Sequence, residues 1–212
     1  MSLKSFNLII KKKIPTFKKN IVVDSDKSIS IRSFLISSIS HNISKVNNAL
    51  ESEDVLSAIT CLKKLGVKIK KKKTGKYVVY GKGLGSLFSK KNSSLNFGNS
   101  GTLARLLVGI LSTTPNIELR IEGDNSLNKR SMKKLVQLMS KFGALFLPKN
   151  KFKFPLKIIS SEIPVGINYK AGVSAQLKSA VMFAGLNSYG DTIIEENEKS
   201  RDHTENLSLI HI

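Results

Sequence analysis

The amino-acid sequence predicts an α/β fold built from repeated units of the form strand–helix–strand–helix–strand–strand. Stretches with apolar residues at helical spacing alternate with short apolar runs that suit strands. The order of these stretches recurs along the chain, and two of the expected helices end alike. Residues 62–67 read LKKLGV, and residues 139–144 read MSKFGA. Internal similarity of this kind is typical of a repeat architecture, so we expect one domain of consecutive units.

The first unit covers about residues 20–87. We expect Asp26 to cap its first helix and Gly66 to end its second, because aspartate and glycine favour these two kinds of helix end. Its expected elements are a strand at 20–24, a helix at about 27–39, an extended piece at 44–50, a helix opening at 51–54, and a hairpin with strands at 67–70 and 77–80.

The second unit covers about residues 88–160, and Gly143 is expected to stop its second helix. Its expected elements are a strand at 95–97, a helix opening at 99–102, a strand at 117–121, a helix opening at Ser126 with apolar residues at 132, 135, 136 and 139, and strands at 144–147 and 154–159.

The third unit begins at about residue 161. Its expected elements are a strand at 167–170, a helix at 174–186, a strand at 191–195 and a helix opening at 201–205. The closing strand pair is missing from this unit, which leaves an apolar face without its cover. We therefore expect residues 20–212 to form one domain with an incomplete third repeat. We also expect the chain to be a fragment of a longer protein.

The chain of 212 residues is strongly basic, with a formal net charge of +20. Its lysine runs are spread over separate turns without interleaved aromatic residues, so the pattern does not indicate a nucleic-acid platform. We interpret the charge as a compositional bias that also steers anionic ligands towards the protein. A basic nucleic-acid-binding domain stays open as an alternative. It predicts salt-dependent binding to any duplex.

Cys61 is the single cysteine, so no internal disulfide can form, and a reducing cytoplasm is expected. We interpret Cys61 as a small core residue and not as a nucleophile. No run is long enough to span a bilayer. Lysines 11–13 follow the first apolar residues instead of preceding them, which is the wrong order for a secretory signal. The three histidines have no metal-ligand spacing.

Several expected helices begin with groups that attract anions. In a repeat protein, equivalent helix ends come to one side, so their partial positive charges and their cations can converge. We therefore expect a pocket for a ligand that carries more than one anionic group, with arginines gripping phosphate or carboxylate. The groups are Lys27 and Ser28, residues 99–102 with Gly101, Lys129 and Arg130 in a first turn, Ser174 to Gln176, and Arg201.

These residues belong to motifs that resemble those of 5-enolpyruvylshikimate-3-phosphate (EPSP) synthases, in the form of the second bacterial class. The resemblance extends from residue 20 to residue 205 in the same order. Its motifs are residues 26–32 (DKSISIR), 50–55 (LESEDV), 98–105 (GNSGTLAR), 128–130 (NKR), 174–180 (SAQLKSA) and 201–205 (RDHTE).

The resemblance implies the enolpyruvyl transferase fold, an inside-out α/β barrel with two domains of three repeats each and the active site in the cleft between them. Residues 20–212 would form most of the first domain, and the lead-in 1–19 would belong to the absent second domain. The implied reaction moves the enolpyruvyl group of phosphoenolpyruvate to the 5-hydroxyl of shikimate 3-phosphate and releases phosphate. The resemblance implies no metal or organic cofactor, a monomer when complete, and a fragment that is inactive alone.

The resemblance also implies a role for each matched residue. Lys27 would be catalytic and touch both substrates, and Gln176 would lie near both. Gly101 and Arg130 would border phosphoenolpyruvate. The residues that would hold shikimate 3-phosphate, besides Lys27, are Ser28, Arg32, Ser174, Ala175 and Arg201.

The sequence departs from the family pattern at several positions. Asp24 and Ser25 replace a usual Pro-Gly, Ser131 replaces a usual proline, and Ile31 stands where histidine is common. The family residues that handle protons lie beyond residue 212. The related UDP-N-acetylglucosamine enolpyruvyl transferases share the fold and stay open as an alternative. They have Lys-Asn where this chain has Lys27 and Ser28.

Overall fold

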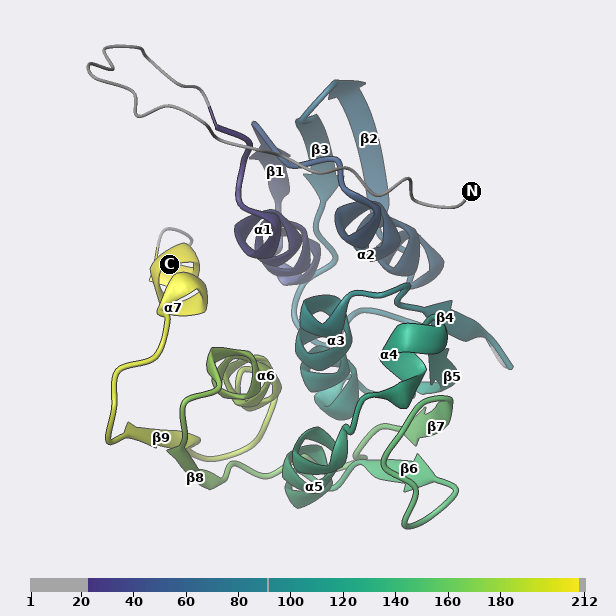
Figure 1. Cartoon of the computed structure of the whole chain (residues 1–212), viewed down its shortest axis with the longest axis vertical. Coiled ribbons are helices and arrows are strands. Elements are labelled where there is room, and N and C mark those ends of the chain that lie inside the picture. Colours follow the sequence, from purple (N-terminus) through teal and green to yellow (C-terminus); the bar gives the residue numbers. More distant parts are fainter. Residues whose placement is uncertain (1–22, 91, 210–212) are drawn as a thin grey trace, which may run out of the picture.

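The computed structural model describes residues 23–90 and 92–209 (Figure 1). The three sheets lie on the outside, and the helices between them face inward (Figure 1). The elements are α1 (Lys27–Ile39), β1 (Ile43–Val46), α2 (Glu53–Lys64), β2 (Lys68–Lys73), β3 (Lys76–Tyr80), β4 (Ser94–Asn96), α3 (Gly101–Thr113), β5 (Glu118–Glu122), α4 (Asn125–Lys129), α5 (Lys133–Lys141), β6 (Leu145–Leu147), β7 (Leu156–Ile159), β8 (Asn168–Ala171), α6 (Ala175–Gly185), β9 (Ile193–Glu196) and α7 (His203–Leu209).

The sheets confirm the predicted repeat. The first sheet has the strand order β1-β3-β2, and the second has β4-β5-β7-β6. In the first sheet β3 pairs antiparallel with both β1 and β2, and in the second sheet β7 pairs antiparallel with both β5 and β6. In each of these two units the last strand therefore lies between the other strand of its hairpin and the strand that precedes the second long helix. The third sheet, β8-β9, is parallel, as is the pair β4-β5. Among the described residues, the second unit therefore shares its antiparallel pairing with the first unit and its parallel pairing with the third.

Two expectations fall at the beginning of the chain. The lead-in 1–19 lies outside the described residues, and so does most of the strand expected at 20–24. Val23 and Asp24, which are described, are not in a strand. The helix that follows matches its expected bounds of 27–39, because the Asp26 carboxylate accepts a hydrogen bond of 2.7 Å from the Ile29 N–H.

The single helix expected from Ser126 to Gly143 is wrong, because the chain forms two helices there, α4 and α5. Asp124 caps α4, and Arg130 ends it in an extended conformation. The Met132 N–H then donates to the Phe152 carbonyl at 2.7 Å, instead of continuing the helix. Arg130 consequently lies at the end of a helix and not in its first turn, so this helix contributes no positive dipole end beside it.

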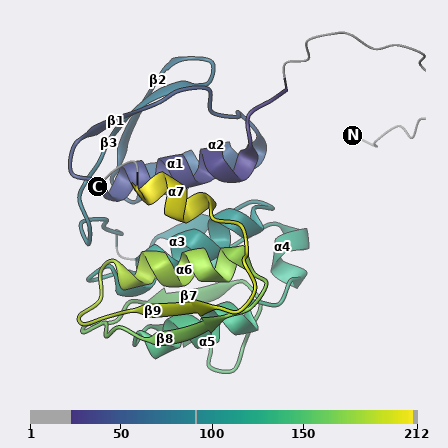
Figure 2. The same cartoon turned by 90° about the vertical axis from the view of Figure 1, so that its left-hand side faces the viewer.

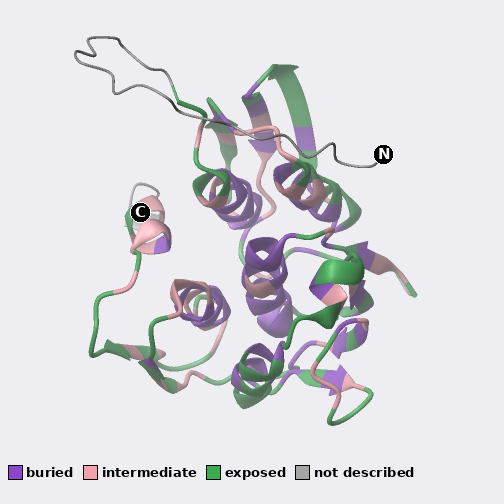
Figure 3. Cartoon of the chain, viewed as in Figure 1, coloured by how far each residue is buried: buried purple, intermediate pink, exposed green. Residues whose placement is uncertain are grey.

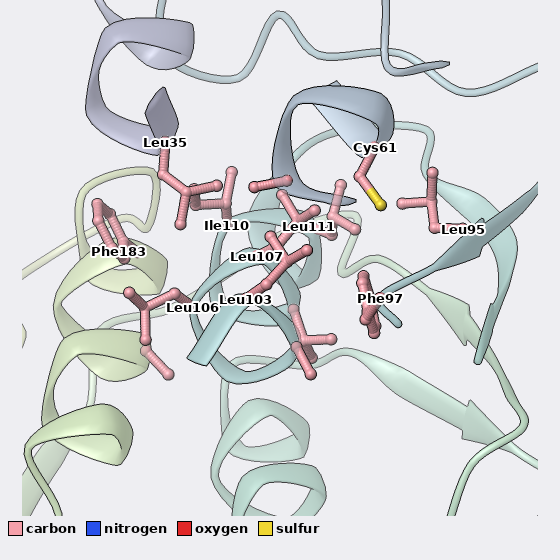
Figure 4. Close-up of a cluster of buried hydrophobic side chains, with 14 of the residues drawn as sticks. Leu35, Cys61, Leu95, Phe97, Leu103, Leu106, Leu107, Ile110, Leu111 and Phe183 are labelled. Atoms are coloured by element: carbon pink, nitrogen blue, oxygen red, sulfur yellow. The ribbon is translucent and has the colours of Figure 1, made fainter. Parts of the chain in front are cut away.

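The core is built around α3, which is buried along most of its length (Figure 3). The side chains of Leu103, Leu106 and Leu107 lie between α6 on one side and α2 with β4 on the other (Figure 4). Helices α3 and α6 approach closely at Gly109, where an added Cβ would lie 2.4 Å from the Ala180 carbonyl oxygen. A glycine is therefore required at this crossing for steric reasons.

Cys61 belongs to the same core, as predicted. Its thiol is buried and donates to the Asn96 carbonyl at 3.3 Å (Figure 4). Burial raises the pKa of the Cys61 thiol to about 12. The thiolate is the reactive form of cysteine, so this residue is a poor nucleophile at neutral pH. In the part of the chain that the structure describes, no helix is long and apolar enough to cross a membrane.

Glu51 connects the tip of the β2–β3 hairpin to the start of α2. Its carboxylate accepts hydrogen bonds from the Lys71 ammonium at 2.7 Å, the Gly75 N–H at 2.8 Å and the Tyr77 hydroxyl at 2.7 Å. These hydrogen bonds lower the pKa of Glu51 to about 2, and the bond from Lys71 has the largest effect. The hairpin tip therefore depends on the ionised carboxylate.

We expect Glu51→Gln to lower the melting temperature at neutral pH. A lowered carboxyl pKa stabilises the folded state above the unfolded value of 4.5, and this contribution is lost as the pH falls through about 2. The difference in melting temperature between the two proteins should therefore shrink as the pH falls from 5 to 2. Glu162→Gln, at an exposed position, is the control and should cause little change. A difference that does not vary with pH would contradict the expectation.

Candidate functional site

The site begins at the first residue of α1. The Lys27 ammonium forms an ion pair of 2.7 Å with Asp54, which lies in the first turn of α2. The Lys27 side chain keeps about half of its surface exposed, at 49%. A cation at a helix start is unfavourable by itself, and Asp54 offsets that cost. Lys27 is thereby fixed in place while its ammonium stays open to a ligand.

A cavity of about 340 Å³ opens beside this ion pair. The helices α1, α2, α3 and α6 all begin at it, and the end of α4 closes one side. Figure 2 shows α1, α3 and α6 stacked with similar axis directions. The positive ends of several helix dipoles therefore point to one place. The lining residues are Lys27, Asp54, Asn99, Gly101, Thr102, Arg105, Arg130 and Gln176.

Two guanidinium groups lie against the backbone of Gly101, the first residue of α3. Arg105 donates to the Gly101 carbonyl at 2.9 Å, and Arg130 donates to the Asn99 side chain at 2.6 Å. A Cβ on Gly101 would lie 2.8 Å from Nη1 of Arg105 and 3.3 Å from Nη1 of Arg130. Glycine at this position thus leaves room for both arginines to face the cavity.

The cavity has an excess of positive charge. It is lined by the three cations Lys27, Arg105 and Arg130 and by one carboxylate, Asp54, which leaves a net charge of +2. Burial, followed by the charge of Arg130, lowers the pKa of Arg105. Among residues 23–90 and 92–209, no carboxylate forms an ion pair with Arg105 or Arg130. Two neighbouring guanidinium groups of this kind can bind one phosphate or carboxylate together.

Gln176 reaches the cavity from the start of α6. Its side-chain amide donates to the Thr102 hydroxyl at 3.0 Å, which links α6 to α3. Ser174 caps α6 by accepting from the Leu177 N–H at 3.4 Å, and Ala175 is the first residue of the helix. Ser174 and Ala175 are not among the lining residues of the cavity, although Gln176 is.

Arg32 lies in a second group of polar side chains, between α1, α6 and α7. It is only 3% exposed, and it donates to the Thr204 hydroxyl at 2.7 Å and to the Ser179 hydroxyl at 3.2 Å. It also donates to the Ser28 carbonyl at 3.3 Å. Burial is the main cause that lowers the pKa of Arg32, and the nearby charge of Arg201 contributes. Arg201 itself is exposed.

Most of the expected site residues therefore fall into two groups. The cavity brings together Lys27, Gly101 and Gln176 from helix starts, as anticipated, and Arg130 from the end of α4. The second group, between α1, α6 and α7, contains Ser28 and Arg32, and the charge of Arg201 reaches Arg32 there. Ser174 and Ala175 lie at the start of α6, just before Gln176.

Sequence reasoning expected residues 99–102 at the cavity but assigned no role in the site to two charged lining residues, Asp54 and Arg105. Each of these two residues carries a signal in the sequence. Arg105 follows Gly101 by four residues, so it lies on the same face of α3. Asp54 is an acidic residue in the first turn of the second helix of the unit that begins with Lys27, and helix starts are expected to converge.

The chain is similar in sequence to proteins of the EPSP synthase family. The sequence profile of the EPSP synthase (3-phosphoshikimate 1-carboxyvinyltransferase) family matches residues 11–208. A 3-phosphoshikimate 1-carboxyvinyltransferase from Caldicellulosiruptor saccharolyticus is 42% identical over 190 residues, covering 89% of this chain and 43% of the relative. One from Paramagnetospirillum magneticum is 39% identical over 184 residues, covering 86% and 41%.

A solved structure gives the same result for the fold. The EPSP synthase from Acinetobacter baumannii superposes with a TM-score of 0.81 at 35% identity, covering 88% of this chain and 42% of the other. The predicted enolpyruvyl transferase fold is confirmed by this similarity. The chain spans less than half the length of the curated relatives it matches.

Proposed function

The chain belongs to the EPSP synthase family, and on that premise we propose that it binds shikimate 3-phosphate and phosphoenolpyruvate for enolpyruvyl transfer. The observation that supports this most is the cavity with a net charge of +2 at the start of four helices. Both proposed substrates are anions with more than one charged group. A basic cavity without internal carboxylate partners for its arginines suits such ligands.

In this proposal, the cavity takes phosphoenolpyruvate. Arg105 and Arg130 hold one of its anionic groups, and Gly101 allows that group to approach the backbone closely. Lys27 lies where it can contact both ligands, and its ammonium stabilises negative charge that develops on the oxygens. Gln176 reaches between the two ligands from the start of α6.

Shikimate 3-phosphate is then held by the second group of side chains. Ser28 and Arg32 lie on α1 in hydrogen-bond contact, the charge of Arg201 just before α7 reaches Arg32, and Ser174 and Ala175 offer the backbone N–H groups of the α6 start. Free N–H groups at a helix start bind phosphate well. The transfer forms a bond from the 5-hydroxyl oxygen to the enolpyruvyl carbon and breaks the bond from that carbon to the phosphate oxygen, and the proton lost by the hydroxyl balances the phosphate that is released.

Further parts of the proposal concern the whole enzyme. We place residues 20–212 in the first domain of the family and residues 1–19 in the second. Proton transfer and cleft closure are assigned to that second domain, so we expect no turnover by this chain alone. The complete protein is proposed to be a monomer, and its single cysteine suits the cytoplasm.

Calorimetry with shikimate 3-phosphate tests the proposal. We expect weak binding at millimolar ligand, and Lys27→Ala should abolish the heat because it removes the half-exposed ammonium between the two groups. Lys72→Ala, at an exposed position on β2, is the matched control and should bind like the unchanged chain.

Two outcomes would count against the proposal. The first is no heat from protein shown to be folded by circular dichroism. The second is strongly salt-dependent binding to duplex DNA that Lys27→Ala and Lys72→Ala weaken equally, which would favour a basic nucleic-acid-binding domain. Heat with UDP-N-acetylglucosamine and none with shikimate 3-phosphate would favour the related transferase instead.

A further inference from the structure

Lys178 is a charged residue deep inside the protein, on the second turn of α6. It is only 2% exposed. Its ammonium forms two ion pairs, one of 2.9 Å with Glu196 and one of 2.5 Å with Glu205. A buried ammonium is costly unless it is paired, and here two carboxylates offset that cost. Lys178 is not among the residues that line the cavity, and its ion-pair partners Glu196 and Glu205 do not line it either.

The two carboxylates lie at opposite ends of one segment. Glu196 is the last residue of β9, and Glu205 lies in the first turn of α7. The loop between them, residues 197–202, carries Arg201. Glu196 additionally accepts hydrogen bonds from the Ser200 N–H and hydroxyl, at 3.2 and 2.6 Å. A single buried side chain thus holds both ends of the loop.

A second contact depends on the same arrangement. Thr204, next to Glu205 on α7, is 2% exposed and its hydroxyl lies 2.7 Å from the hydroxyl of Ser179, next to Lys178 on α6. Both hydroxyls accept from Arg32. Figure 2 shows α7 lying between α1 and α6, which agrees with these contacts. The position of α7 therefore decides how the Arg32 guanidinium is oriented.

We infer that Lys178 is a positioning residue, which fixes loop 197–202 and the start of α7 through Glu196 and Glu205, and thereby sets Arg201 and Thr204 relative to Arg32. This inference rests on the proposed function in so far as Arg32 and Arg201 hold shikimate 3-phosphate. The two arginines carry the same charge and repel each other, so they stay close only if the surrounding structure holds them.

Hydrogen exchange followed by mass spectrometry tests the positioning role without any ligand. In Lys178→Met, which is close in shape and lacks the charge, the amides of residues 197–207 should exchange at least about tenfold faster. The amides of α3 should stay as protected as in the unchanged chain. Glu205→Gln and Glu196→Gln each remove one of the two ion pairs and should give smaller increases. Lys178→Arg keeps the cation and should restore most of the protection.

A matched control and the ligand complete the test. Lys157→Met removes an exposed lysine that pairs with Glu118 within the second sheet, away from β9 and α7. It should leave the hydrogen exchange of residues 197–207 unchanged. Shikimate 3-phosphate should bind at least about tenfold more weakly to Lys178→Met and normally to Lys157→Met, as measured by calorimetry.

Two outcomes would overturn the inference, and a third would overturn the proposed function. Unchanged exchange of residues 197–207 in folded Lys178→Met would overturn the inference, and so would faster exchange with unchanged affinity for shikimate 3-phosphate. If Lys178→Met does not fold, Glu205→Gln and Glu196→Gln carry the same comparison. An unchanged chain that binds no shikimate 3-phosphate would overturn the proposed function, whereas the exchange of the loop would still decide whether Lys178 holds it.

Discussion

Gly109→Val is expected to destabilise the folded protein strongly. The added Cβ would lie 2.4 Å from the carbonyl oxygen and 2.9 Å from the Cα of Ala180, so α3 and α6 would have to move apart. Overpacking in a dense core costs about 1–3 kcal/mol or more, and here backbone atoms cannot rotate away. We expect a loss near the upper end, about 3 kcal/mol, and a fall in melting temperature of about 10 °C.

Gly172→Val is the control for the change at Gly109. It adds the same atoms at an exposed glycine where no atom lies within 4 Å of the added Cβ, and thermal unfolding should shift little. Because a domain is stable by only about 5–15 kcal/mol, the two variants should be easy to distinguish by calorimetric or spectroscopic melting. Similar melting temperatures for both would show that the helices do not cross at Gly109 as described.

The largest expected effect in the cavity follows from changing Arg105 and Arg130 together. Each charge-assisted hydrogen bond to an anion contributes about 1.5–3 kcal/mol, so removal of either guanidinium should weaken phosphoenolpyruvate binding by about tenfold to hundredfold. The double change Arg105→Gln with Arg130→Gln should abolish measurable binding, because it leaves only one cation, Lys27, and one carboxylate, Asp54, among the lining residues, so the net charge of the cavity falls to zero.

Arg120→Gln provides the control for the two arginines. Arg120 lies on β5 and is 60% exposed, where it pairs with Glu122 on the same strand. Calorimetric titration with phosphoenolpyruvate in the presence of shikimate 3-phosphate should distinguish the variants. A loss of affinity that is equal in Arg120→Gln and Arg130→Gln would mean that binding follows net charge and not the cavity.

Much of the fold could be predicted because each helix carries its own local signals. The apolar spacing, the Asp26 cap and the Gly66 stop define α1 and α2 without any distant contact. The break between α4 and α5 could not be predicted in this way. The apolar spacing continues across Arg130, and the hydrogen bond that diverts the chain comes from Phe152, which lies far along the sequence.

The same difference between local signals and distant contacts applies to the candidate site. Helix starts can be located from sequence, and a repeat predicts that they converge, which is how Lys27, Gly101 and Gln176 come to share one cavity. The environment of Arg32 could not be anticipated. Its charge is visible in the sequence, but its burial depends on α6 and α7, whose residues are 147 and 172 positions away.

That separation has a consequence for how the protein is made on the ribosome. Arg32 emerges early, and its partner Thr204 is translated 172 residues later. During most of synthesis the guanidinium must remain hydrated, since a charge without partners is not taken into an apolar interior. Most of the first two repeats can pack as they emerge, whereas the face of α1 that carries Arg32 reaches its final surroundings only after α7 has left the exit tunnel. The contacts of Arg32 therefore form late, when nearly the whole nascent chain has been translated.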